Sequence, residues 1–154
     1  TQSTTNGEDI MTAIDETDQR ILTMLEADGR ATLAQLAQAT GLSVSAAQSR
    51  VQKLEKRGII KGYKAIIDQE QRGLPISAFV NVTPLDYSAE SSIPDKLNNI
   101  DGIVSCYSVA GAPSFVLVVR VASPTALEEL LNLIHRTVPV STETTMILQT
   151  YFAH

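Results

Sequence analysis

The chain has 154 residues, of which 44% are hydrophobic, and a formal net charge of −5 at pH 7. This length suits one ordinary domain or two small ones, and the apolar content permits a buried core, which argues against a disordered chain. The acidic balance excludes a protein coated in positive charge, so any contact with nucleic acid has to come from a local basic patch.

Cysteine usage and hydropathy indicate a cytoplasmic protein with no membrane partner. Cys106 is the only cysteine, so no disulfide can form within the chain, and a reducing compartment fits. No apolar run approaches the length that spans a bilayer, and the first residues are polar and acidic, unlike a signal peptide. We expect residues 1–12 to be a disordered tail.

Residues 14–28 predict the first helix, with Asp15 or Thr17 near its start. Its apolar residues recur at helical spacing and are Ile14, Ile21, Leu22 and Leu25. This side of the helix is the natural cover for the two helices that follow, which would complete a unit of three helices.

The next stretch predicts two short helices joined by a tight turn. Thr32 and Gln35 have the spacing of a capping box, Gly41 supplies the turn, and Ser43 is the expected N-cap of the second helix. Gly58 ends that helix. The residues expected to face inward on it are Val44, Ala47, Val51 and Leu54.

The outer side of this second helix is rich in hydroxyl, amide and cationic side chains. Positions 43–64 hold six cations against one acid, a net charge of +5 in a chain of opposite sign. The alternative is a solvated amphipathic helix, but the caps, the turn and the basic side together favour a helix-turn-helix unit that binds double-stranded DNA. The candidate DNA contacts are Ser43, Ser45, Gln48, Ser49, Arg50, Lys53 and Arg57.

Residues 59–68 alternate weakly and predict a strand or a hinge. Gly73 and Pro75 then mark a boundary. We expect a DNA-binding domain at 13–64, a strand or hinge linker at 65–75, and a second domain at 76–154.

The second domain predicts six elements in the order βαββαβ. Such an order is typical of a ferredoxin-like sandwich, with a four-stranded antiparallel sheet and both helices on one face, so the whole chain belongs to the α+β class. The expected strands are 78–83, 103–110, 115–121 and 145–152, and the expected helices are 91–99 and 125–136.

The strand at 115–121 is apolar on both faces, although only one face of such a sheet carries helices. Leaving the other face in water would forgo roughly 1.5 to 3 kcal/mol for each large side chain. We therefore expect a homodimer, at least, formed by two sheets face to face. A two-fold dimer also suits two DNA half-sites one helical turn apart.

Three stretches resemble the Lrp/AsnC family of feast/famine regulators. They read IDETDQRILTMLEADGRATLAQLA, GLSVSAAQSRVQKLEKRGIIKGYKAIID and CYSVAGAPSFVLVVRV, so the resemblance covers nearly all of the chain from Ala13, and the run from Gly41 to Tyr63 is its most specific part. It implies a winged-helix-like DNA-binding domain, a second domain that senses a free amino acid, and dimers assembled into tetramers or octamers.

Taken alone, residues 109–115 predict only a tight connection between two strands. The resemblance implies that this connection and the facing segment 141–145 hold an amino-acid effector between neighbouring dimers. The effector-binding residues that it implies are Val109, Gly111, Ala112, Ser114, Thr142 and Thr144. Many family members have an acid where Ser114 stands, and Pro113 removes an N–H group, so ligand choice is expected to differ, with apolar amino acids favoured.

Enzymatic interpretations find little support. His135, His154 and Cys106 have no metal-site spacing, and Cys106 is expected to be an inert packing group. We find no phosphate loop or nucleophile motif and expect no cofactor. The sequence favours a transcription regulator; the alternatives are an amino-acid-binding module that regulates a metabolic enzyme and an architectural DNA-binding protein.

Overall fold

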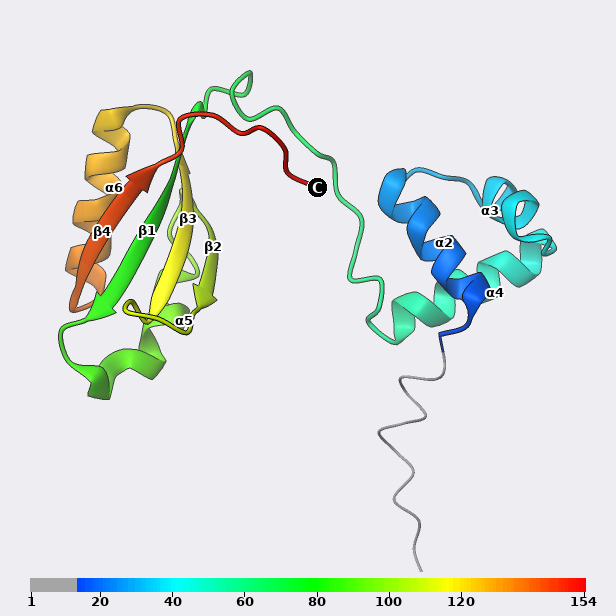
Figure 1. Cartoon of the computed structure of the whole chain (residues 1–154), viewed down its shortest axis with the longest axis horizontal. Coiled ribbons are helices and arrows are strands. Elements are labelled where there is room, and N and C mark those ends of the chain that lie inside the picture. Colours follow the sequence, from blue (N-terminus) through cyan, green and yellow to red (C-terminus); the bar gives the residue numbers. More distant parts are fainter. Residues whose placement is uncertain (1–13) are drawn as a thin grey trace, which may run out of the picture. The chain divides into compact units, whose positions relative to one another are not determined.

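The structure is a computed structural model of the chain and describes residues 14–154. The chain divides into two compact units, Thr1–Ile66 and Ile67–His154 (Figure 1). The tail expected at residues 1–12 lies outside the described residues.

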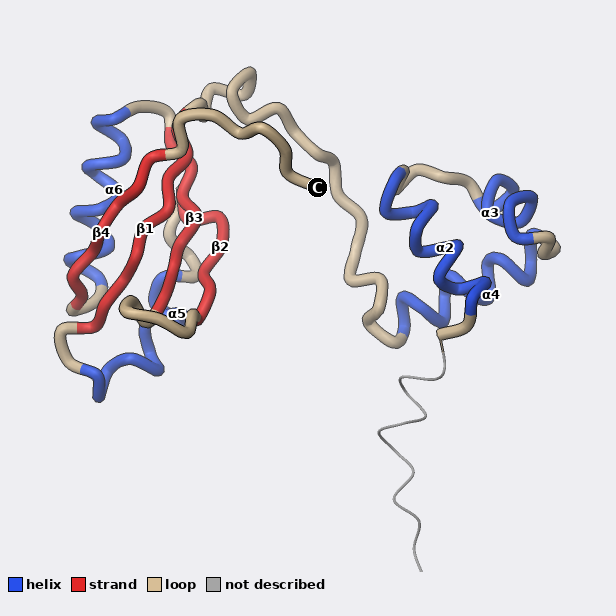
Figure 2. Tube along the Cα trace, viewed as in Figure 1, coloured by secondary structure: helices blue, strands red, loops and turns tan. Residues whose placement is uncertain are grey.

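Within the described residues, the first unit consists of three helices, which are drawn in blue in Figure 2. They are α2 (Glu16–Ala27), α3 (Leu33–Thr40) and α4 (Val44–Lys56). Side chains from all three helices form its core, and the buried ones are Ile21, Leu36, Ala37, Ala47, Val51 and Leu54. The expected three-helix arrangement is confirmed. The prediction that Val44 faces inward is wrong. This side chain is 50% exposed, because the buried residues of α4 begin only at Ala47.

Short-range hydrogen bonds fix the helix ends. The Thr32 hydroxyl accepts from the Gln35 N–H at 3.1 Å, and the Gln35 side chain accepts from the Thr32 N–H at 2.9 Å, which confirms the capping box. Gly41 takes a φ of 73°, a left-handed conformation that favours glycine, and so turns the chain between α3 and α4. The Ser43 hydroxyl caps α4 by accepting from the Ala46 N–H at 3.1 Å.

The chain after α4 first makes a turn and then runs without regular secondary structure. The N–H groups of Ile59 and Ile60 both donate to the Leu54 carbonyl, and residues 61–68 then form no strand. Of the two alternatives for this segment, strand and hinge, no strand is found, because none of the described elements pairs with its backbone.

The second unit is a four-stranded antiparallel sheet with strand order β2-β3-β1-β4. Its helices α5 and α6 pack against one face, as Figure 1 shows. This confirms the ferredoxin-like expectation. The elements in chain order are β1 (Ile76–Pro84), the 3₁₀ turn η1 (Tyr87–Ser92), α5 (Ile93–Leu97), β2 (Ile103–Ser108), β3 (Phe115–Val121), α6 (Pro124–Thr137) and β4 (Val140–Met146).

Two predicted elements differ from the structure. The helix expected at 91–99 is divided into η1 and the short α5, which has Pro94 in its first turn. The last strand is not 145–152 but β4, because β1 pairs with the chain from Val140 to Met146. After Ile147 the chain leaves the sheet, and Leu148 is 96% exposed.

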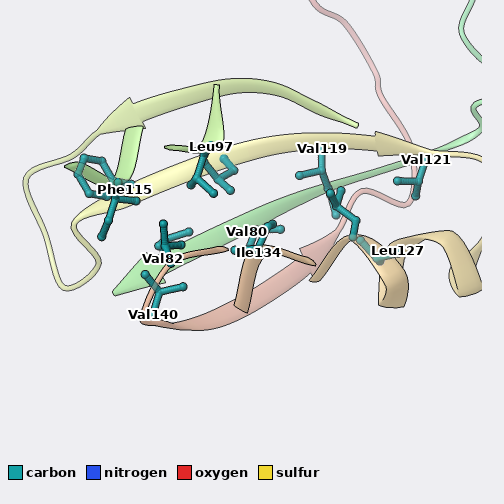
Figure 3. Packing of buried hydrophobic residues seen from close by; sticks show 14 residues of the cluster. Val80, Val82, Leu97, Phe115, Val119, Val121, Leu127, Ile134 and Val140 are labelled. Atoms are coloured by element: carbon teal, nitrogen blue, oxygen red, sulfur yellow. The ribbon is translucent and has the colours of Figure 1, made fainter. Parts of the chain in front are cut away.

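The core of this unit lies between the sheet and the helices. Figure 3 shows Val80 and Val82 of β1 packed with Val119 of β3 and Ile134 of α6. The opposite face of the sheet, which we call the open face, carries an apolar pair at its centre, as expected for the strand 115–121: Phe79 is 43% exposed there and is paired with Val118, while the pairs Ser77–Arg120 and Asn81–Glu143 on the same face are polar. In the part of the chain that the structure describes, no helix is long and apolar enough to cross a membrane.

Candidate functional site

The helix α4 presents most of the candidate DNA contacts to solvent. Its buried side is narrow, because Ala47, Val51 and Leu54 lie on one side of the helix. Six of the seven candidates are exposed on α4 or at its caps, and these are Ser43, Ser45, Gln48, Ser49, Lys53 and Arg57. The hydroxyl and amide groups lie in the first half of α4 and the cations in the second half, as expected.

The two serines at the start of α4 differ in their hydrogen bonds. The Ser43 oxygen accepts the capping bond from the Ala46 N–H, which leaves its O–H donor and one lone pair to bind another group. Ser45 makes no capping bond, and its hydroxyl lies 3.3 Å from that of Ser43. The pair therefore offers hydroxyl groups at the N-terminus of α4, where the helix dipole is positive.

Arg50 is the candidate that departs from this pattern. Its Nη1 lies 2.6 Å from Oδ2 of Asp15 and 3.2 Å from Oδ1 of Asp18, so the guanidinium is directed to α2. The hydrogen bond from Arg50 lowers the pKa of Asp15, and the two carboxylates raise the pKa of Arg50 above its ordinary value. This geometry was not foreseen from the sequence, because the partners lie 35 and 32 residues away.

The predicted effector residues of the β2–β3 connection lie at one end of the sheet. The Val109 N–H donates to the Ser114 carbonyl at 3.2 Å, and the Ser114 N–H donates to the Val82 carbonyl at 3.1 Å. The N–H of Ser114 is therefore already used in the fold. Gly111 and Ala112 are exposed, and no hydrogen bond to their N–H groups is found within residues 14–154.

Thr142 and Thr144 lie in β4, opposite Val82 and Val80 of β1 respectively. Val82 is also paired with Phe115, the residue after Ser114, so Thr142 and the β2–β3 connection share one end of the sheet. They are two strand spacings apart, about 10 Å. Thr144 lies two residue pairs further from that end.

His135 is a neighbour of this site that sequence reasoning missed. Its Nε2 lies 2.9 Å from Oγ1 of Thr142, so the last turn of α6 is joined to β4 beside the predicted effector residues. The sequence offered only the position of His135 near a helix end, where a histidine complements the dipole. The contact depends on the pairing of β4 with β1, which the sequence placed five residues too late.

Cys106 is exposed on the edge strand β2, so its expected role as a packing group is wrong. Partial burial still raises the pKa of its thiol, which leaves the thiolate a minor form at neutral pH. Across residues 14–154 no group of three or more His, Cys, Asp or Glu side chains is arranged to hold a metal ion.

Both units match known families. Residues 14–61 match the model of winged helix-turn-helix DNA-binding domains, and residues 77–154 match that of the Lrp/AsnC ligand binding domain. The HTH-type transcriptional regulator LrpA of Mycobacterium tuberculosis is 52% identical over 141 residues, which cover 92% of this chain and 94% of LrpA.

Solved structures of similar proteins have the same fold. A feast or famine regulatory protein from M. tuberculosis, complexed with L-methionine, superposes with a TM-score of 0.88 at 51% identity, covering 91% of this chain and 95% of that one. E. coli AsnC superposes with a TM-score of 0.85 at 29% identity, covering 92% and 96%. The chain therefore belongs to the Lrp/AsnC family of transcriptional regulators, with a helix-turn-helix unit followed by a ligand-binding domain.

Proposed function

We propose that the protein is a sequence-specific regulator of transcription whose DNA binding or assembly is modulated by an amino acid. The observation that carries this proposal is the outer side of α4, where exposed hydroxyl, amide and cationic side chains stand on a helix held by a cap at its start and a glycine turn before it. Ser45, Gln48 and Ser49 would meet base edges in the major groove, while Lys53 and Arg57 would hold phosphates.

The effector would bind beside the β2–β3 connection. The exposed backbone of Gly111 and Ala112 offers N–H groups for a carboxylate and carbonyl groups for an ammonium. Ser114 and Thr142 contribute hydroxyl groups, and His135 orients that of Thr142. Because these residues include no carboxylate, an apolar amino acid fits best, as the L-methionine complex of the M. tuberculosis relative supports. The proposal requires no metal or cofactor.

The regulator would act as a homodimer or a larger assembly of dimers. The open face of the sheet, with Phe79 and Val118, is the surface that a second copy would cover. A two-fold dimer presents two α4 helices to two half-sites. The effector would then shift the equilibrium between arrangements of the assembly, which changes DNA affinity by linkage. A regulator of this kind would act in the cytoplasm, where the chromosome lies, and would catalyse no reaction.

A capture of sheared genomic DNA at physiological salt tests the proposal, with and without a pool of the twenty amino acids. Selective enrichment of a few fragments that changes with the pool is expected. Enrichment that ignores the pool would refute the effector proposal. Enrichment without sequence preference would favour an architectural protein, and no enrichment would favour a module that regulates an enzyme.

A variant separates the two halves of the proposal. Thr142→Val removes the hydroxyl and keeps the size of the side chain, so the response to amino acids should weaken while the selection of DNA without the pool stays the same. Thr125→Val, on the exposed start of α6, is the matched control and should respond as the unsubstituted protein does.

A further inference from the structure

Arg50 lies at the seam between α2 and α4. Its side chain is 32% exposed, and the carboxyl side chain of Asp18 that faces it is 12% exposed. A carboxylate so poorly hydrated needs an ionic or hydrogen-bonding partner, because burial without one is costly. The guanidinium of Arg50 is that partner.

Asp15 joins the same contact to the start of α2. Its Oδ1 accepts from the Asp18 N–H at 2.8 Å, which caps α2, and its Oδ2 accepts from Arg50. Both oxygens are thus engaged, one by each helix. The first turn of α2 and the middle of α4 are therefore held together at one point.

We propose that Arg50 is a positioning residue, which fixes α4 on α2 through Asp15 and Asp18 and makes no phosphate contact of its own. The proposal rests on the proposed function only in taking α4 as the helix that enters DNA. It removes Arg50 from the set of phosphate contacts that the basic outer side of α4 suggests.

Charge supports this role. Two carboxylates compensate the charge of Arg50, so this guanidinium attracts a phosphate less than an unpaired cation would; Lys53 and Arg57 line the same hollow and leave its surroundings positive. Lys53, three residues further along α4, is exposed and has no ion pair among the described residues. Arg50 and Lys53, although three residues apart on one helix, would therefore have different roles: Arg50 would hold α4 on α2, and Lys53 would contact a phosphate.

The ion-paired cluster of Arg50, Asp15 and Asp18 is placed where it would restrain the rotation of α4 about its axis. Arg50 precedes the buried Val51 and lies three residues after the buried Ala47, both with small side chains. The whole buried stripe of α4 is only three residues wide in sequence, with Leu54 as its one large side chain. An ion pair at the edge of this stripe adds a directional restraint on the rotation of the helix about its axis. The rotation of α4 decides where Gln48 and Ser49 point, so Arg50 would act on sequence discrimination.

The test measures affinity of the full chain for a captured operator fragment and for a random fragment, each over a range of salt. Each phosphate contact contributes about 0.9 to the slope of log affinity against log salt. Lys53→Ala should lower that slope by about 0.9 on both fragments. Arg50→Ala should leave the slope on the random fragment unchanged and lower the operator preference about tenfold, the size of one lost base contact.

Asp15→Asn gives the sharpest contrast, because the two roles predict opposite signs. If Arg50 positions α4, this variant should lose operator preference although no cation has been removed. If Arg50 contacts a phosphate, removal of a competing carboxylate should strengthen binding to both fragments. Arg50→Lys keeps the charge, but its side chain ends one atom short of Nη1, the atom that makes both contacts, and it should fail to restore the preference.

Stronger binding by Asp15→Asn, or a slope lowered by Arg50→Ala to the same extent as by Lys53→Ala, would overturn the proposal. Should Arg50→Ala fail to fold, Asp15→Asn and Arg50→Lys decide by the same measurements. If the unsubstituted protein binds no DNA, the proposed function fails, and a double-mutant cycle on thermal unfolding tests the contact instead: additive losses for Arg50→Ala and Asp15→Asn would show that no coupling exists.

Discussion

The open face of the sheet allows the proposed homodimer to be tested by one substitution. Phe79 is 43% exposed, and about 200 Å² is typical for the burial of a phenylalanine, so a second copy would cover roughly 85 Å² of its side chain. At about 25 cal/mol per Å² this corresponds to about 2 kcal/mol for each subunit. A two-fold interface contains the residue twice, so Phe79→Ala should weaken the dimer by about 4 kcal/mol, or about a thousandfold in Kd.

Sedimentation velocity over a dilution series of the full chain measures this change. Leu133→Ala is a suitable control, because Leu133 is 38% exposed but lies on α6, away from the open face. Its dissociation should begin at the same concentration as that of the unsubstituted protein. Thermal unfolding of each variant separates weaker assembly from a weaker fold.

The reasoning fails if the unsubstituted protein has the mass of a monomer at the highest accessible concentration. The reasoning also fails if the Phe79→Ala variant dissociates at the same concentration as the unsubstituted protein, since the exposed ring would then lie outside the interface.

Three further predictions concern the fold. Gly41→Ala should cost about 1 kcal/mol in denaturant unfolding, because its φ of 73° strains an L residue while the new Cβ meets nothing within 4 Å; an equal cost for Gly41→Asn would contradict this origin. Ile134→Ala, at 0% exposure, should cost about 2 to 5 kcal/mol, and a smaller loss would mean that the core closes around the gap. Arg50 lowers the pKa of Asp15 below its ordinary value of 3.8, so the unfolded chain binds the proton more readily. This contribution to stability is complete above the unfolded pKa and is lost as pH falls through the lower folded pKa; Asp15→Asn should flatten acid unfolding below about pH 4, and an unchanged profile would refute the linkage.

Much of the first unit can be read from the sequence because its signals are local. The capping box at Thr32, the turn at Gly41 and the cap at Ser43 each involve residues within a few positions of one another, and all three are found in the structure. The duty of Arg50 could not be read in this way. Its partners lie in another helix, and only the packing of α2 against α4 brings them together.

The second unit shows the same division. The alternation along Phe115–Val121 predicted a strand with two apolar faces, and α6 followed from its helical spacing. The last strand was misplaced because Ser141 to Thr145 are polar and the more apolar residues after them resemble a strand. The pairing with β1 fixes the position of the last strand, and such pairing depends on two segments that are far apart in the sequence.

The sequence alone thus determined the order of elements, the basic outer side of α4 and the family, since each depends on local spacing or composition. Only tertiary structure showed that Arg50 is paired with Asp15 and Asp18, whereas Lys53 has no ion pair among the described residues. It also placed His135 beside Thr142. The physical reason is that hydrogen bonds and ion pairs act over a few ångströms, and the chain brings distant residues within that range only when its packing is complete.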